Sequence, residues 1–298
     1  MEKFLAFDIG GTFIKYAVIK EDAELVESGK TATPDTLEGL INIIVGYAEA
    51  NADAKGIAIS APGAVSEEGI VYGSSALPYI HGPNIKQMVK EKTNRPVFME
   101  NDANCAGYAE VWKGAARGKQ DVLAVVLGTG IGGAVIKNGS LHKGAHLHGG
   151  EFGYMLTRPE LSEEDNTWSA TASTAALVRM VAAAKRVESS SLSGEKIFSM
   201  AETGDNDCIN AIDKFYHNLA VGLYNLQYIF DPELIVIGGG ISARPDLTDR
   251  IGEKLEQILS RIDIATVKPK IAACHFRQNS NLLGAVYGLM KQINPSYR

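Results

Sequence analysis

Two glycine-rich stretches and a few carboxylates are the residues of this chain whose types and spacing could do chemistry. Asp8-Ile9-Gly10-Gly11-Thr12 follows one apolar run, and Gly128-Thr129-Gly130-Ile131-Gly132-Gly133 follows another. Glycine lets backbone N–H groups approach an anion closely, and a neighbouring threonine hydroxyl adds a donor. Asp8 stands where a carboxylate could hold Mg²⁺, directly or through water. The pattern indicates phosphate binding, although each turn taken alone could equally be a plain hairpin.

The second stretch also matches Gly-x-Gly-x-x-Gly, the pattern of dinucleotide-binding folds. In those folds the motif opens a helix whose N-terminus faces the pyrophosphate. Here Ala134-Val135-Ile136-Lys137 and the turn Asn138-Gly139 predict a second strand and a hairpin instead. A dinucleotide fold is therefore excluded. A P-loop is excluded too, because the sequence has no Gly-x-x-x-x-Gly-Lys-Ser/Thr.

A third glycine cluster, Gly238-Gly239-Gly240, ends the apolar run Leu234–Ile237 and precedes a predicted helix. Such a turn would let a flat base or a ribose lie against the backbone. A crowded crossover from strand to helix would need the same glycines, and the sequence leaves both interpretations open.

Two carboxylates could act on the acceptor side of a phosphoryl transfer, as a proton acceptor or as a ligand-binding group. Asp102 follows a predicted strand and opens a predicted helix, where the helix dipole would keep it ionised and able to accept a proton, while Asn101 could fix its orientation. It could instead simply cap that helix. Glu151 follows Gly149-Gly150 and is either a ligand-binding or a solvated loop carboxylate.

Periodicity predicts an alternation of strands and helices with one internal repeat, strand–glycine turn–strand, which begins near residues 4 and 122. We place the domain boundary in Gly114–Lys119. The predicted strands are Phe4–Phe7, Ile14–Ile19, Gly56–Gly63, Pro96–Glu100, Val122–Leu127, Ala134–Lys137 and Leu234–Ile237. The predicted helices are Thr36–Ala50, Ala103–Trp112, Cys208–Phe230 and Pro245–Ile262.

Composition excludes several classes of protein. The 298 residues suffice for two domains, and 45% hydrophobic with 21% charged residues is ordinary for a globular protein. The net charge of −6 argues against nucleic-acid or membrane partners. No apolar run is long enough to span a bilayer, and the first residues do not resemble a signal peptide. The three cysteines form neither a disulfide framework nor a metal clip, so we expect a cytoplasmic protein with reduced thiols.

Four motifs in order give a specific resemblance. Asp8-Ile-Gly-Gly-Thr-x-x-Lys15, Glu100-Asn-Asp-Ala-Asn104, Gly128-Thr-Gly-Ile-Gly-Gly133 and Gly149-Gly-Glu-Phe-Gly153 resemble the motifs of the ROK family, which comprises sugar kinases and transcriptional repressors. The resemblance implies an α/β fold with two actin/hexokinase-like (ribonuclease H-like) domains around a central cleft. It implies an N-terminal domain of residues 1–117 plus 281–298, in which the last helix, about 281–293, packs back, and a C-terminal domain of residues 118–280.

The same resemblance implies the roles of individual residues in an ATP- and Mg²⁺-dependent sugar kinase. Asp102 is the implied catalytic base, and Asp8 the implied Mg²⁺ residue, through water. The implied ATP and phosphate residues are Asp8, Gly10, Gly11, Thr12, Lys15, Gly128, Thr129, Gly130, Gly238, Gly239 and Gly240. The implied sugar residues are Gly63, Ala64, Ser75, Asn101, Asp102, His148, Glu151 and Tyr154. A homodimer and closure of the domains around the sugar are expectations at the level of the family.

One departure from the family pattern concerns zinc. His142, His146 and His148 lie close together, but many relatives bind a structural zinc with one histidine and three clustered cysteines. This sequence has Tyr154 at that histidine, and Met155–Thr174 contains no cysteine, so we expect no zinc.

Tyr154 and the altered segment Leu156–Thr174, which is shorter than in relatives, would change the anomeric end of the sugar pocket. We therefore expect that a β-glucoside such as cellobiose could enter. Leu77–Asn84 and Trp168–Ser173 also resemble zinc-less β-glucoside kinases. Tyr79, Tyr154 and Trp168 could stack on a second sugar, although core packing accounts equally well for Trp168.

Several alternatives stay open at this point. N-acetylmannosamine, glucose and fructose are all substrates within the family. Only seven residues precede Asp8, which leaves no room for the DNA-binding domain of the family's repressors. A non-catalytic sugar-sensing regulator is disfavoured by the retention of Asp8, Thr12, Asp102 and both glycine turns.

Overall fold

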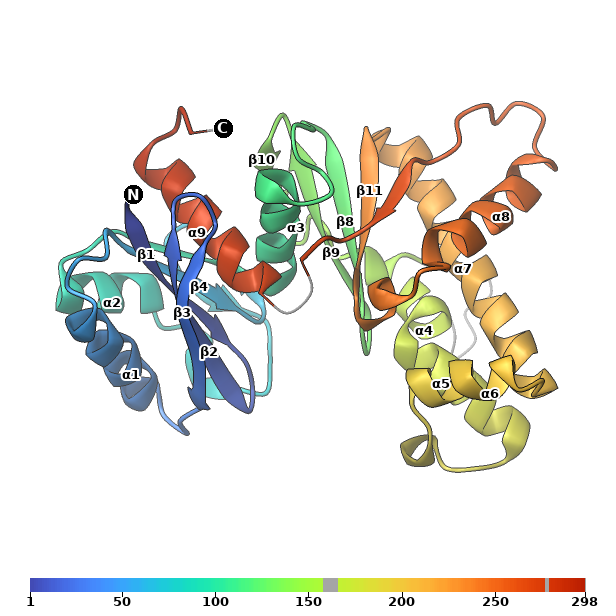
Figure 1. Ribbon diagram of the computed structural model, residues 1–298, viewed down its shortest axis with the longest axis horizontal. Helices are drawn as coiled ribbons and strands as arrows, with labels where there is room; N and C mark the ends of the chain where they lie inside the picture. Colours follow the sequence, from blue (N-terminus) through green and yellow to red (C-terminus); the bar gives the residue numbers. More distant parts are fainter. Residues whose placement is uncertain (158–165, 277–278, 298) are drawn as a thin grey trace. The chain divides into compact units, whose positions relative to one another are not determined.

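The computed structural model describes residues 1–157, 166–276 and 279–297 (Figure 1). By internal contacts the chain divides into two compact units. The first comprises Met1–Gln120, Val135–Gly149 and the C-terminal segment, and the second comprises most of the chain between them. The described residues form two five-stranded sheets, one wholly in the first unit and the other mainly in the second, each with a glycine turn between two adjacent strands.

The first unit is built on a sheet with strand order β3-β2-β1-β4-β7. Its strands are β1 (Lys3–Ile9), β2 (Phe13–Lys20), β3 (Leu25–Ala32), β4 (Ile57–Ala61) and β7 (Val97–Asn101). β1 pairs antiparallel with β2 and parallel with β4, which pairs parallel with β7. β1 and β4 are apolar at nearly every position because helices cover both faces of the sheet. β5 (Ala64–Val65) and β6 (Val71–Tyr72) form a small separate ribbon.

Four helices cover this sheet, α1 and α2 on one face and α3 and α9 on the other (Figure 1). They are α1 (Leu37–Ala50), α2 (Ile85–Thr93), α3 (Asp102–Lys113) and α9 (Ser280–Ile293), and Pro78–Ile80 forms a 3₁₀ turn. Residues Leu282–Met290 of α9 are all buried. A Cβ at Gly284 would overlap the carbonyl oxygen of Cys105, so a glycine is required for α9 to approach α3 this closely.

The second sheet has strand order β10-β9-β8-β11-β12. Its strands are β8 (Val122–Leu127), β9 (Ile131–Lys137), β10 (Ser140–Leu141), β11 (Leu234–Gly239) and β12 (Ile271–Ala273). β11 runs parallel to both β8 and β12. β9 begins in the second unit and ends in the segment assigned to the first.

The second unit carries a cluster of helices around the long α7. They are α4 (Trp168–Ala172), α5 (Thr174–Lys185), α6 (Gly194–Glu202), α7 (Asn206–Phe230) and α8 (Leu247–Leu259), with 3₁₀ turns at Phe152–Tyr154, Ser189–Ser191 and Gly240–Ala243. α4, α5, α6 and α8 all pack on α7, which presents a buried apolar stripe to them (Figure 1). Among the described residues, no helix is long and apolar enough to cross a membrane.

The predicted elements are present, with shifted ends. The helix expected at Ala103–Trp112 begins one residue earlier, and the one expected at Pro245–Ile262 spans Leu247–Leu259. Thr36 is the N-cap of α1 rather than its first residue, because its side chain accepts a hydrogen bond from the Gly39 N–H. The exposed edge strand β3 and the helix α5 were not predicted, since neither shows a strong apolar periodicity.

Candidate functional site

Asp8 lies near the end of β1, where neighbouring elements fix its carboxylate. Its Oδ1 accepts hydrogen bonds from Ser60 Oγ at 2.9 Å and Asn281 Nδ2 at 3.1 Å. Lys15 Nζ lies 3.7 Å from Oδ2. Ser60 stands opposite Asp8 on β4, and Asn281 is in the first turn of α9, so residues distant in sequence hold one carboxylate. The side chain keeps 14% of its exposure, which leaves room for a further ligand.

The turn after Asp8 is held by backbone and side-chain hydrogen bonds, and its tip is exposed. Gly10 N–H donates to the Phe13 carbonyl at 3.1 Å. The Thr33 hydroxyl donates to the Gly10 carbonyl at 2.7 Å, and the Thr33 N–H donates to the Thr12 carbonyl at 3.1 Å. Gly11 and Thr12 at the tip are exposed. The turn therefore presents backbone and a hydroxyl to solvent on a rigid base, as a phosphate-binding turn requires.

The turn at Gly128–Gly130 in the second unit also joins two strands and is held by hydrogen bonds. Gly128 N–H donates to the Gly130 carbonyl at 2.9 Å, and its own carbonyl accepts from the Thr174 N–H at 2.9 Å. Ile131 N–H donates to Ser169 Oγ at 2.8 Å. Gly128, Thr129 and Gly130 are all exposed. A strand follows the turn, so the exclusion of a dinucleotide fold is confirmed.

In the third glycine cluster, one glycine fits a crowded crossover and another fits an open surface for a base or a ribose. Gly239 has φ +89°, and a Cβ there would overlap the Leu127 carbonyl oxygen, so this glycine is required where β11 passes β8. Gly240 has no atom within 4 Å of its Cβ position and lines a cavity of about 660 Å³. Crowding thus explains Gly239, whereas Gly240 faces open space.

The cavity beside Gly240 has apolar walls and a charged rim. Leu177, Phe198 and Ile241 are among its apolar lining residues. The Arg244 guanidinium lies 4.0 Å from the centre of the Phe198 ring and pairs with Asp246 at 2.9 Å. That hydrogen bond lowers the pKa of Asp246 and raises that of Arg244, so both stay charged at neutral pH. A cavity of this size and lining suits a flat heteroaromatic ring with polar edges.

Asp102 is the first residue of α3, but Asn101 is the residue that caps the helix. Asn101 Oδ1 accepts from the N–H groups of Ala103 at 2.9 Å and Asn104 at 3.2 Å. Asp102 Oδ1 also accepts from the Ala103 N–H, at 2.8 Å, but the N-cap position itself is taken by Asn101. Asp102 is exposed in the first turn of α3.

The loop after β4 lies beside this helix start. Asn101 Nδ2 donates to the Gly63 carbonyl at 3.0 Å, which links the loop to the residue before Asp102. Gly63 has φ +95°, a conformation that favours glycine. Ser75 Oγ is 2.9 Å from His81 Nε2, so Ser75 is oriented from within the same unit. The first unit thus contains Gly63, Ala64, Ser75, Asn101 and Asp102, all predicted sugar residues.

The remaining predicted sugar residues are on loops. His148 Nδ1 lies 2.6 Å from the His146 carbonyl oxygen, and both residues are exposed, as is His142. Glu151 precedes a 3₁₀ turn in the second unit, and Tyr154, which ends that turn, is 72% exposed. In the described residues, no three His, Cys, Asp or Glu side chains are grouped as a metal site would need. Part of the altered segment Leu156–Thr174, residues 158–165, lies outside the described residues.

Of the two interpretations of Trp168, core packing is confirmed and stacking on a sugar is wrong. Its side chain is fully buried, its Nε1 donates to the Asn218 carbonyl at 3.0 Å, and its ring packs directly on Gly222 of α7. Tyr79 is half-buried with its hydroxyl donating to the Pro34 carbonyl at 2.5 Å. Of the three aromatic residues, Tyr154 alone keeps a largely exposed ring.

Sequence reasoning missed the residues that hold the predicted ones in place: Ser60, Asn281 and the pair Glu100–Lys143. Ser60 and Glu100 interrupt otherwise apolar buried strands, and that interruption was the available signal. Asn281 and Lys143 gave none, because their partners are far away in the sequence.

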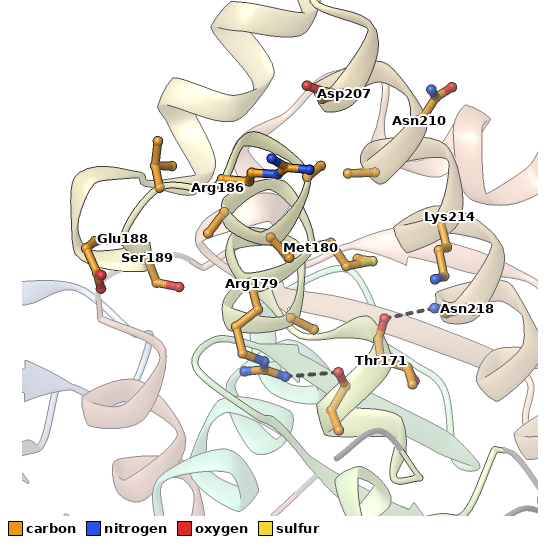
Figure 2. Close-up of a pocket in the computed structure, with 17 residues that line it drawn as sticks. Thr171, Arg179, Met180, Arg186, Glu188, Ser189, Asp207, Asn210, Lys214 and Asn218 are labelled. Atoms are coloured by element: carbon orange, nitrogen blue, oxygen red, sulfur yellow. Dashed lines mark hydrogen bonds between the residues drawn. The ribbon is translucent and has the colours of Figure 1, made fainter. Parts of the chain in front are cut away.

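A groove of about 1150 Å³ runs between α5 and α7 in the second unit (Figure 2). Arg179, Arg186 and Lys214 line it, but Arg179 already donates to the Ala170 carbonyl at 3.0 Å. None of the predicted site residues lines this groove.

Known proteins resemble this chain over nearly its whole length. The ROK family model matches residues 4–292. This chain belongs to the ROK family. A β-glucoside kinase from Listeria monocytogenes is 35% identical over 297 residues, covering 98% of this chain and 99% of the relative.

Solved structures of ROK proteins share the fold. A ROK family protein from Streptococcus pneumoniae in complex with sucrose has a TM-score of 0.92 and 39% identity, covering 98% of this chain and 99% of that chain. A ROK family glucokinase from Streptomyces griseus in complex with glucose and AMPPNP has a TM-score of 0.73 and 27% identity, covering 95% and 97%. The predicted actin/hexokinase-like fold is therefore confirmed.

Proposed function

We propose that this chain, an ATP-dependent sugar kinase of the ROK family, transfers the γ-phosphate to the 6-hydroxyl of a hexose unit in a β-glucoside such as cellobiose. One observation carries the assignment of the base. Asn101 occupies the N-cap position of α3, and Asp102 is exposed at the helix start. Asp102 then accepts the proton of the attacking hydroxyl, and positioning and charge neutralisation supply the rest of the rate.

The phosphate side rests on the two glycine turns. In this proposal Gly10, Gly11 and Thr12, with Lys15, bind one part of the triphosphate, and Gly128, Thr129 and Gly130 bind another. The adenine base occupies the cavity lined by Gly240, with Gly238 and Gly239 shaping the end of β11. Arg244, which lines the cavity and pairs with Asp246, would present its guanidinium to the ribose or the base.

Asp8 suits Mg²⁺ held through water. A single carboxylate with Oδ1 fixed by Ser60 and Asn281 is a fitting partner for a cation that keeps most of its own water ligands. When bound, Mg²⁺ would neutralise charge on the phosphate oxygens.

The sugar side is assigned to Gly63, Ala64, Ser75, Asn101, His148, Glu151 and Tyr154. Support for a β-glucoside comes from the relative named β-glucoside kinase and from the exposed Tyr154 at the position of the family's zinc histidine. N-acetylmannosamine, glucose and fructose remain the alternative acceptors, and a non-catalytic sugar-sensing regulator is the alternative of a different class.

A coupled ATPase assay over cellobiose and glucose tests the substrate. We expect kcat/KM for cellobiose to exceed that for glucose by at least about tenfold, since a second ring can contribute contacts. A strong preference for glucose would contradict the β-glucoside assignment and leave the kinase assignment intact.

Asp102→Asn tests the mechanism in the same assay. We expect kcat to fall roughly 10²–10⁴-fold, with little change in sugar affinity measured by calorimetry, because the amide keeps the shape but cannot take the proton. Near-normal turnover would show that another group is the base.

A further inference from the structure

Glu100, the residue two positions before Asp102, is a buried carboxylate with a full set of partners. Its side chain is 4% exposed. Oε1 accepts from the Asn101 N–H at 2.8 Å and from Asn104 Nδ2 at 3.0 Å, and Oε2 accepts from Lys143 Nζ at 3.0 Å. The carboxylate therefore holds the backbone before Asp102 and the side chain two residues after it.

Lys143 supplies the positive charge that this buried carboxylate needs. Its side chain is 15% exposed, and its Nζ also donates to the Val65 carbonyl at 2.9 Å. Its own carbonyl accepts from the Gly149 N–H at 2.8 Å, two residues before Glu151 in the sequence. One residue thus joins the loop Gly63–Val65, the start of α3 and the segment that leads to Glu151.

The two hydrogen bonds of Lys143 Nζ, to Glu100 and to Val65, serve different functions. The bond to Glu100 compensates a buried charge, because an unpaired carboxylate there would be strongly disfavoured. The bond to Val65 does nothing for that charge balance. It fixes the separation between the proposed sugar loop and the turn that carries Asp102, and small errors in such a separation are costly in phosphoryl transfer.

We propose that Lys143 is a positioning residue of this kinase, which ties the Gly63–Val65 loop to the Glu100–Asp102 turn so that the sugar hydroxyl meets the base. The inference rests on the proposed function, in which Asp102 is the base and the loop contacts sugar. Lys143 touches neither reacting group and acts through Glu100 and Val65.

Lys143→Met keeps the aliphatic chain and removes both bonds. We expect kcat to fall about 10- to 100-fold, while KM for ATP stays within about twofold, since the contacts described for Lys143 do not include the phosphate turns. Lys86→Met is the matched control. Lys86 Nζ also donates to a backbone carbonyl in the neighbouring loop, that of Glu67 at 2.7 Å, but no carboxylate within the described residues pairs with it. This control should keep kcat within about twofold of the wild type.

The double variant Glu100→Gln with Lys143→Met separates positioning from charge compensation. It removes the buried charge along with its partner, so we expect the melting temperature to recover relative to Lys143→Met alone. We expect kcat to stay low, because the bond to Val65 is still missing. Recovery of kcat in step with the melting temperature would overturn the proposal, and so would a Lys143→Met enzyme with normal kcat.

Asp102→Asn, assayed in parallel, keeps the two proposals apart. An inactive Asp102→Asn enzyme beside a fully active Lys143→Met enzyme contradicts only the positioning role. An active Asp102→Asn enzyme contradicts the base assignment and, with it, the positioning of that base.

Discussion

The two glycine turns share a backbone design but differ in the residue that precedes them. Each turn joins two adjacent strands, is held by hydrogen bonds to neighbouring segments and has an exposed tip. Two residues before the first glycine, the first turn has Asp8, held by Ser60 and Asn281, whereas the second has Val126. The strand–turn–strand unit is therefore repeated, and in the proposed function both copies bind phosphate while only the first adds a carboxylate for a cation.

Removing that difference should give the largest effect. Asp8→Asn keeps the hydrogen-bonding shape but loses the charge, so we expect kcat to fall about 100-fold or more in the ATP-coupled assay. Val126→Thr, the matched change before the other turn, should lower kcat by no more than about threefold. Equal losses in the two variants would mean that the carboxylate does not distinguish the turns.

Substitution of Gly239 or Gly240, at the end of β11, should have an intermediate effect. Gly239→Ala places a Cβ against the Leu127 carbonyl in a backbone conformation that favours glycine, so we expect a loss of at least about 2 kcal/mol in the free energy of unfolding. Gly240→Ala has open space around its Cβ and should leave stability unchanged. It should instead raise KM for ATP several-fold, because the cavity lined by Gly240 becomes smaller. Chemical denaturation and steady-state kinetics of both variants check the pair, and similar unfolding curves would contradict it.

The smallest expected effect is a difference in alkylation between the thiols of Cys105 and Cys274. Burial, with the nearby charges of Glu100, Asp8 and Asp102, raises the pKa of the Cys105 thiol well above its usual range. Cys105 therefore stays protonated at pH 8 and should resist alkylation, whereas the half-buried Cys274 beside Gly238 should react first. Mass spectrometry after brief iodoacetamide treatment measures the order of labelling. Labelling of Cys105 before Cys274 would show that the first unit opens more readily than its packing indicates.

Local sequence patterns were enough to predict the helices and strands that have a strong apolar periodicity. The runs before both glycine turns are strands because they are apolar at successive positions, and the period-3.6 stripe of α7 was visible in the sequence. The exposed edge strand β3 and the alanine-rich α5 lacked such a signal, since their burial depends on neighbours rather than on their own pattern. Trp168 shows the limit of residue type, because its ring serves the core under α7 and not a ligand.

The sequence by itself determined the chemistry available to this protein: a carboxylate before one glycine turn, a second turn without one, and Asp102 at a helix start. Spacing along the chain carries that information, because each motif is a local feature of a few residues. Only the tertiary structure decided what holds those groups. Ser60 and Asn281 meet Asp8, and Lys143 meets Glu100 and Val65, through hydrogen bonds between segments 43 to 273 residues apart, which no local pattern encodes.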